Sequence, residues 1–196
     1  MDRYLLAVDR LSARIGKAFA WCIVALTVMV CFDVVARYVF RAPTSWGLDV
    51  SLMFYAALFM MAGAYTLSRN GHVRGDVLYR FLSPRVQASL DLALYLLFFI
   101  PGIGALAWFG VGFAADSWTM LEQSQTTSNG LPVYPLKTLI PIAGILLLIQ
   151  GFAEIFRCVI CIRTGAWPLR QHDIEELDVE ELKASLAESQ KTGSGK

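Results

Sequence analysis

Few side chains in this sequence could carry out chemistry, and their spacing argues against most kinds of site. The two histidines, His72 and His172, both lie in polar segments outside the long apolar runs. Membrane subunits that hold haem need histidines within their helices as axial ligands, so a b-type cytochrome is excluded. Cys158 and Cys161 form a C-x-x-C pair, but a structural zinc site takes four ligands and no second pair follows. We expect both cysteines to act as small apolar residues, and we assign the chain no cofactor and no metal.

The sequence also lacks the motifs of the common enzyme classes. Phosphate-binding loops, nucleophile elbows and HExxH helices each require a fixed pattern of glycine, serine or histidine, and none of these patterns is present. The sequence therefore predicts no catalytic residues and no enzymatic activity. The formal net charge is only +1, and without a strongly basic face we expect no binding to nucleic acid.

Ionisable side chains near the apolar runs lie toward the ends of those runs. Asp33 stands four residues before Arg37, the favourable order for an ion pair on one helix face. Glu154 similarly stands three residues before Arg157. A carrier that couples transport to protons or cations by itself is expected to keep a carboxylate deep in the bilayer, where an ionisable group costs about 2.5–3.5 kcal/mol. The pattern instead predicts a membrane protein whose activity depends on a partner.

Four long apolar runs must position these groups. Of the 196 residues 56% are hydrophobic and 17% are charged, whereas a soluble domain has about 25% charged residues. A bilayer core about 30 Å thick is crossed by about 20 apolar residues in a helix. We predict an all-α integral membrane protein with four transmembrane helices, at residues 18–35, 50–67, 88–114 and 138–156. Pro101 and Gly102, in the middle of the third run, predict a kink.

The positions of Lys and Arg predict the orientation. Fourteen of the 17 lie in the N-terminal segment, the second loop and the C-terminal end, and three lie in the first and third loops. The positive-inside rule then places both termini and the second loop in the cytoplasm. The first and third loops then face the far side of the membrane, which in the inner membrane of a bacterium is the periplasm.

The two ends of the chain are predicted to lie outside the bilayer. Residues 1–17 form an amphipathic cytoplasmic surface helix. Its apolar stripe consists of Tyr4, Val8, Leu11 and Ile15. Asp9 lies on the opposite side with the basic residues. Two interpretations stand, a helix that rests on lipid and a helix that braces a partner subunit. The four-helix domain occupies residues 18–165, and residues 166–196 form a polar, acidic cytoplasmic tail without assigned chemistry.

The polar segments carry a resemblance to a known family. The motif begins at Arg37, the partner of Asp33 in the predicted ion pair. The residues that carry the resemblance are Arg37, Tyr38, Trp46 and Asp49, then Gly71, His72, Arg74 and Asp76 in the second loop, and Gln150 in the fourth span. In this order, with four spans, the chain over roughly residues 1–165 resembles the small membrane subunit of a tripartite ATP-independent periplasmic (TRAP) transporter, the DctQ-like family.

The resemblance implies a function that the residues alone do not. In that family a periplasmic solute-binding protein delivers a solute, commonly an organic acid, to a large DctM-like membrane subunit. The large subunit moves the solute by an elevator-like motion, driven by an ion gradient that is usually sodium. The small subunit, which is not catalytic, enlarges and steadies the fixed part of the large subunit. The alternative is a self-contained small carrier or channel that works as a homo-oligomer.

The role of the motif residues stays open at this point. His72, Arg74 and Asp76 are explained equally well by a cytoplasmic turn that obeys the positive-inside rule and by contact with a partner. Two explanations likewise stand for Arg37, Trp46 and Asp49: interface anchoring together with a helix start, or contact with the large subunit.

Overall fold

The chain folds into long helices. The computed structural model describes residues 2–69, 79, 81–127, 130–168, 170 and 173. Its elements are α1 (Asp2–Tyr38), α2 (Gly47–Ser68), α4 (Pro84–Leu94), the π-helix η1 (Tyr95–Phe99), α5 (Ile100–Thr119) and α6 (Tyr134–Thr164). Four helices, counting α4, η1 and α5 as one, are long and apolar enough to cross a membrane. The prediction of an all-helical chain with four such helices is confirmed for the described residues.

Each helix extends beyond the apolar run that predicted it, and α1 does so most. Its 37 residues are unbroken, so the segment predicted as a separate surface helix continues directly into the first predicted span. At 1.5 Å per residue, α1 is about 55 Å long, well beyond a hydrocarbon core of about 30 Å. Gly16 of α1 lies against Tyr65, close to the end of α2 at Ser68. The part of α1 before Gly16 therefore projects past the end of α2.

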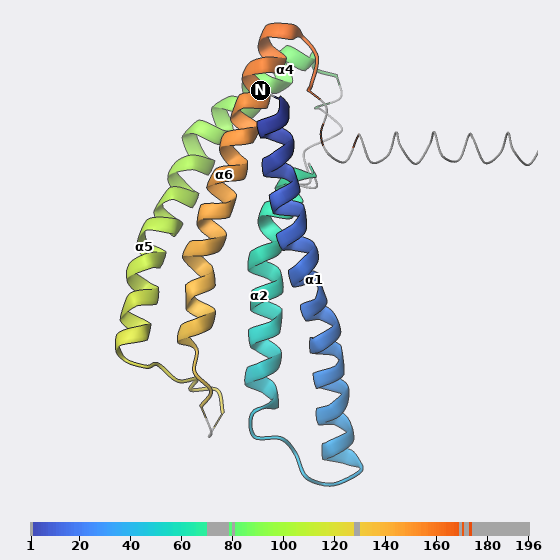
Figure 1. Ribbon diagram of the computed structural model, residues 1–196, viewed down its shortest axis with the longest axis vertical. Helices are drawn as coiled ribbons and strands as arrows, with labels where there is room; N and C mark the ends of the chain where they lie inside the picture. The colour runs from blue at the N-terminus through green and yellow to red at the C-terminus, as the bar shows by residue number, and fades with distance from the viewer. Residues whose placement is uncertain are drawn as a thin grey trace, which may run out of the picture.

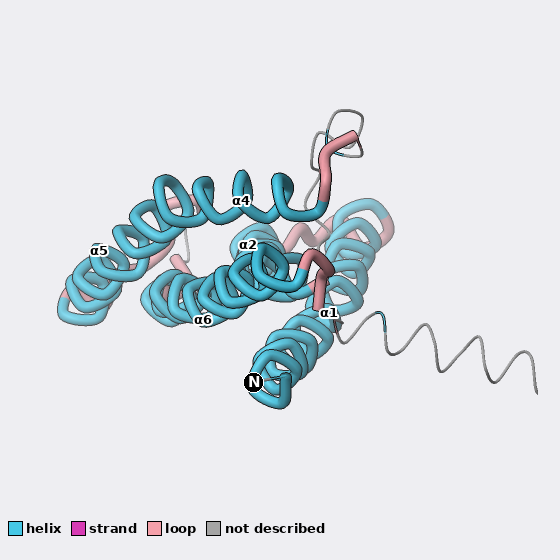
Figure 2. The backbone as a smooth tube through the Cα atoms, turned by 90° about the horizontal axis from the view of Figure 1, so that it is seen from above, coloured by secondary structure: helices cyan, strands magenta, loops and turns pink. Residues whose placement is uncertain are grey.

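The helices form two pairs, α1 with α2 and α5 with α6, joined mainly through α6 (Figure 1). The pairs lie together where α1 begins and α6 ends, which we call the N-terminal end of the bundle, and they spread apart toward the opposite end. Seen from the N-terminal end, α4 and α5 follow one curved path on one side of α6, while α1 lies on the other side (Figure 2). Thus α6, in contact with α1, α2, α4 and α5, is the central helix.

Small residues allow α6 to approach its neighbours closely. A Cβ atom on Gly144 would lie 3.1 Å from the Cα of Ala107 in α5, and one on Gly151 would lie 2.3 Å from a ring carbon of Phe99. Helices in lipid gain their association energy mainly from such close van der Waals packing, because lipid supplies no hydrophobic drive between them. The contacts of these two glycines therefore fix the third span on α6.

The third span is irregular just before Pro101, close to the predicted kink. The turn from Tyr95 to Phe99 has the wider π geometry between the α-helical segments α4 and α5. Proline lacks an N–H, and its ring collides with the carbonyl four residues earlier in a regular α-helix. A π turn is one of the usual ways in which a helix relieves such a clash and changes its direction.

The distribution of polarity is the reverse of that in a soluble protein. The largest fully buried side chains are Arg157, Gln150, Glu154 and Asp9, whereas large apolar side chains such as Trp108 are exposed along the helices. An apolar exterior suits a lipid solvent, and buried polar groups in such a setting must bond to one another. The largest buried polar side chains therefore form a polar interior at the N-terminal end of the bundle.

Candidate functional site

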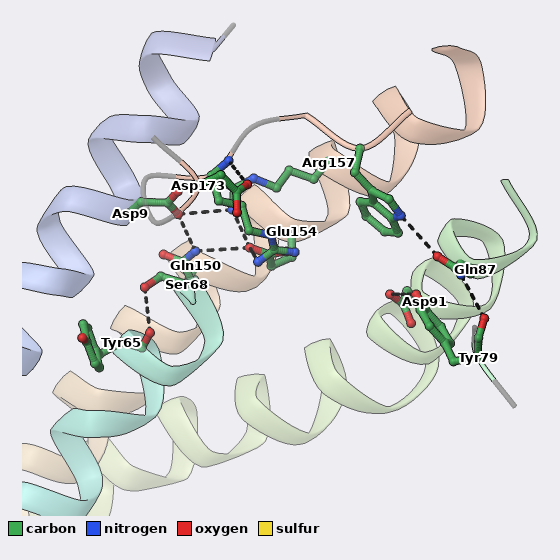
Figure 3. A network of polar contacts seen from close by, with 12 residues as sticks. Asp9, Tyr65, Ser68, Tyr79, Gln87, Asp91, Gln150, Glu154, Arg157 and Asp173 are labelled. Carbon is green, nitrogen blue, oxygen red and sulfur yellow. Dashed lines mark hydrogen bonds and ion pairs between the residues drawn. The ribbon is translucent and has the colours of Figure 1, made fainter. Parts of the chain in front are cut away.

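A network of buried polar side chains joins three segments at the N-terminal end of the bundle (Figure 3). Its members are Asp9 and Ser12 of α1, Gln150, Glu154 and Arg157 of α6, and Arg170 beyond α6. All six are buried. The spacing of the three α6 residues, at i, i+4 and i+7, places them on one face of that helix, so α6 presents a polar face to α1.

Arg157 is the centre of this network. Its Nη2 lies 2.5 Å from Oδ2 of Asp9, and its Nη1 lies 2.5 Å from Oε1 of Glu154. Arg157 is 0% exposed and Asp9 is 1% exposed. Two carboxylates thus share one guanidinium, which offers five donors in a planar fork. Among the described residues, Nε of Arg157 is a buried donor without a hydrogen-bond partner.

A second arginine balances the charge. Nη2 of Arg170 donates to Oε2 of Glu154 at 2.8 Å, and its Nη1 donates to Oε1 at 3.3 Å. The network therefore contains two carboxylates and two guanidinium groups. Because isolated buried charges are costly, this balance is what allows the four groups to be buried together. It also attaches the segment after α6 to the bundle.

Gln150 completes the link between α1 and α6. Its amide Nε2 donates to Oδ1 of Asp9 at 2.9 Å, and its Oε1 accepts a hydrogen bond of 2.9 Å from the hydroxyl of Ser12. Gln150 was predicted as a motif residue, and the structure gives its contacts: it is fully buried and bonds to a helix about 140 residues away in sequence.

The face of α1 that packs within the bundle is not the predicted apolar stripe as a whole. Of that stripe Val8 is buried, whereas Tyr4 and Leu11 are exposed on the outside of the chain, and Asp9, predicted to lie opposite the stripe, is buried against α6. Leu5 and Val8 pack against Ala153 of α6. The physical reason is that α6 offers α1 a charged partner, Arg157, in addition to apolar surface. Local hydrophobic periodicity cannot reveal such a partner.

Asp33 holds the first loop at the opposite end of the bundle. It accepts a hydrogen bond of 2.9 Å from Nη2 of Arg37, the predicted i,i+4 ion pair. It also accepts bonds from the backbone N–H of Thr44, at 3.2 Å, and from the Thr44 hydroxyl. Tyr38, the last residue of α1, is 77% exposed and makes none of these contacts. Asp33 therefore folds residues 39–44 back onto α1.

Asp49 ties the third loop to the start of α2. It is 2% exposed and accepts hydrogen bonds from the hydroxyls of Ser124, at 2.6 Å, and of Thr127. Its place in the first turn of α2 puts the carboxylate near the positive end of the helix dipole. Trp46 is the N-cap residue of α2 and is exposed. The predicted helix start at Asp49 is thus also an anchor for a loop 75 residues away.

A fourth polar cluster, around Glu122, closes the third loop on itself. Glu122 accepts hydrogen bonds from Nζ of Lys137, at 2.5 Å, and from the hydroxyl of Ser117, at 2.7 Å. These two donors hold the pKa of the Glu122 carboxyl below its usual value, Lys137 having the larger effect. The Lys137 ammonium also lies 4.0 Å from the ring centroid of Phe113, a cation–π contact.

The remaining predicted residues divide into two groups. Gly71, His72, Arg74 and Asp76 lie outside the described residues. Cys158 and Cys161 are buried beside Ala88 of α4, and within the described part of the chain no group of His, Cys, Asp and Glu is arranged to hold a metal ion.

The sequence reasoning missed Asp9, Ser12 and Arg170. It did pair Glu154 with Arg157. That charged pair within an apolar helix was the signal in the sequence, because such a pair needs further polar partners from other segments.

The comparison with protein families identifies the chain. The model of the DctQ component of tripartite ATP-independent periplasmic transporters matches residues 26–161, which is more than half of the sequence. The chain belongs to the DctQ family. It is therefore a small membrane component of a TRAP transporter, as the motif residues and the four spans predicted. The match contains Gln150, Glu154 and Arg157 and excludes Asp9 and Arg170. No curated protein matches the chain.

Proposed function

We propose that this DctQ subunit is a non-catalytic scaffold for the large DctM-like subunit of its transporter. The observation that carries the proposal is the place of its buried charges. In the described residues they lie toward the two ends of the bundle, and those of the N-terminal network bond to one another or to neighbouring polar groups of the same chain. Networks in which buried charges pair within one chain hold helices in one arrangement, which is what a fixed frame beside a moving subunit requires.

The middle of the bundle supports the same proposal. There α6 meets α2 and α5 through small and aliphatic side chains, among them Gly63 against Leu147 and Gly144 against Ala107. A substrate or ion site needs convergent polar groups. In this proposal the solute and the coupling ion are handled by the large subunit.

The family indicates the partners of this subunit and the direction of transport, and the sequence indicates the orientation of the chain in the membrane. A periplasmic binding protein delivers the solute, an organic acid or a related compound, and an ion gradient, of sodium in the usual case, drives uptake. The chain lies in the inner membrane with both termini in the cytoplasm, because most Lys and Arg residues lie in the terminal segments and second loop. The third loop, anchored on Asp49, then belongs to the periplasmic face that receives the binding protein.

Purification of the tagged subunit from native membranes in mild detergent, followed by mass spectrometry, tests the proposal. We expect a large multi-span membrane protein in the eluate and none in the eluate from an untagged strain. We also expect uptake to be lost when the gene for this subunit is deleted. Recovery of the chain only as a homo-oligomer that transports solute in liposomes would replace the proposal with the self-contained carrier.

A further inference from the structure

The outer side of α1 carries two basic side chains near the N-terminal end of the bundle. Arg14 and Lys17 are both exposed and stand three residues apart, so they lie on one side of the helix. Neither forms a hydrogen bond or an ion pair with another residue that the structure describes. Arg10 lies on the same side but already has an interaction within the chain. Arg14 and Lys17 are therefore the two cations of this side that are available to a ligand.

The buried ion pair of Asp9 explains why this side of α1 is basic. Asp9 is the only acidic residue from Tyr4 to Trp21. It is 1% exposed, because it faces Arg157 of α6. With Asp9 turned inward, the exposed side chains of this segment are basic, aromatic or aliphatic. A ligand on the outer side of the segment therefore meets positive charge without a compensating carboxylate.

Exposed apolar side chains continue along the same side of α1. At about 100° per residue, a sector of about 60° around the helix axis contains five residues: Arg14, Lys17, Trp21, Val28 and Phe32. The last three are 72%, 63% and 53% exposed. Val28 and Phe32 also line an apolar hollow between α1 and α2, with a volume of about 500 Å³. Positive charge is thus followed by apolar surface on one helix face.

The length of this face matches one phospholipid. The hydrocarbon of one leaflet is about 15 Å thick, which about ten residues of helix span at 1.5 Å each. Phe32 stands 11 residues after Trp21, so an acyl chain that begins beside Trp21 ends close to Phe32. Indole rings prefer the level of the lipid headgroups, and Lys17 precedes Trp21 by about one turn. The two cations therefore lie at the level of the lipid phosphate.

We infer that this side of α1 binds an anionic phospholipid of the phosphatidylglycerol class, with its phosphate on Arg14 and Lys17 and an acyl chain on the apolar surface that starts at Trp21. A guanidinium can hold two phosphate oxygens at once. A phospholipid with an ammonium headgroup fits less well, because this side offers that ammonium no carboxylate. The inference requires that α1 lies in a membrane, and it depends neither on the scaffold role nor on the transported solute.

The test uses the full chain, purified together with any partner and placed in vesicles of equal parts phosphatidylcholine and phosphatidylglycerol. A photo-crosslinking amino acid at Val24, which is 48% exposed and about one turn beyond the indole, captures the neighbouring lipid. Mass spectrometry of the adduct identifies its headgroup. The test variant is Arg14→Gln with Lys17→Gln. The matched control, Arg41→Gln with Arg163→Gln, removes two charges from exposed positions elsewhere on the chain.

We expect phosphatidylglycerol to exceed phosphatidylcholine in the adducts of the otherwise wild-type chain and of the control. The test variant should lose this preference by about 25-fold, because each basic residue near an anionic lipid contributes a factor of about five. Salt at about 1 M, where the Debye length is about 3 Å, should weaken the preference of the wild-type chain as well. The salt series needs no charge variant, so it tests the inference even where the test variant does not fold.

Three outcomes would overturn the inference. One is an equal yield of the two headgroups in the adducts of the otherwise wild-type chain, or a preference that salt does not change. Another is the same loss of preference in the control as in the test variant. The third is capture of a polypeptide of the large subunit instead of a lipid, because a partner helix would then occupy this side of α1.

Discussion

Arg157 of α6 and Asp9 of α1 form an ion pair in which Nη2 lies 2.5 Å from Oδ2. Both side chains are buried from solvent. This pair sets the rotation of α1 about its axis, because Asp9 must face α6. It thereby decides which side of a 37-residue helix meets the rest of the bundle and which side is left for lipid or for the partner subunit. The scaffold role that we propose depends on α1 being held in this one orientation.

The first prediction concerns this pair. Arg157→Leu leaves Asp9 and Glu154 buried with one remaining guanidinium, and we expect it to destabilise the subunit by about 3–5 kcal/mol, the usual effect of breaking a buried ion pair. The double variant Asp9→Leu with Arg157→Leu leaves Glu154 paired with Arg170 and should recover part of that loss. Arg14→Gln, an exposed position on α1, is the control. Thermal unfolding of the purified protein in detergent gives the comparison, and a double variant no more stable than Arg157→Leu alone would contradict the charge-balance argument.

The second prediction concerns the anchor of the third loop. Asp49→Ala removes the acceptor for the hydroxyls of Ser124 and Thr127, so the loop should detach from the start of α2 while the helices stay folded. Hydrogen exchange of the amides of residues 122–127 should then be faster than in the wild-type protein. Asp116→Ala, an exposed carboxylate at the end of α5, should leave this exchange unchanged. Unchanged exchange in Asp49→Ala would show that these bonds do not hold the loop.

The third prediction is a pH dependence at Glu122. Its pKa in the folded chain is lowered from a reference value of 4.5, so the ionised carboxylate stabilises the folded loop fully above that pH. This contribution is lost as the pH falls through the lower, folded value. Glu122→Gln should therefore loosen the loop, measured by hydrogen exchange of residues 117–124, at pH 7. At a pH below the folded pKa, where Glu122 is protonated, variant and wild type should differ little. A difference that is the same at both pH values would rule out the ionised form as the cause.

The fourth prediction concerns the contact between α6 and the third span. A Cβ on Gly151 would lie 2.3 Å from a ring carbon of Phe99, so Gly151→Ala should be overpacked and cost about 1–3 kcal/mol. Gly112→Ala, where a Cβ meets nothing within 4 Å, should cost far less. The double variant Gly151→Ala with Phe99→Leu replaces the ring with a smaller side chain, so it should recover part of the lost stability. Equal unfolding temperatures for the two alanine variants would show that Phe99 of η1 does not pack on Gly151 in this way.

The spans were predictable because each is an apolar run of the required length, and the irregularity of the third span was signalled by Pro101. The ion pairs Asp33–Arg37 and Glu154–Arg157 were also predictable, since they lie within single helices. By contrast, the bonds of Arg157 to Asp9 and of Asp49 to Ser124 join residues far apart in sequence. Local periodicity therefore places Asp9 on the side of α1 opposite the apolar stripe, but it cannot show that this side packs on Arg157.

The central claim, that this DctQ chain supports a large subunit and does not transport by itself, is tested most directly by reconstitution. Proteoliposomes would contain the large subunit alone, this chain alone, or both, with the binding protein and solute outside and an inward ion gradient. We predict uptake only when both membrane subunits are present, and none from this chain alone even when it is correctly folded and inserted. Gradient-driven uptake by this chain alone would contradict the account.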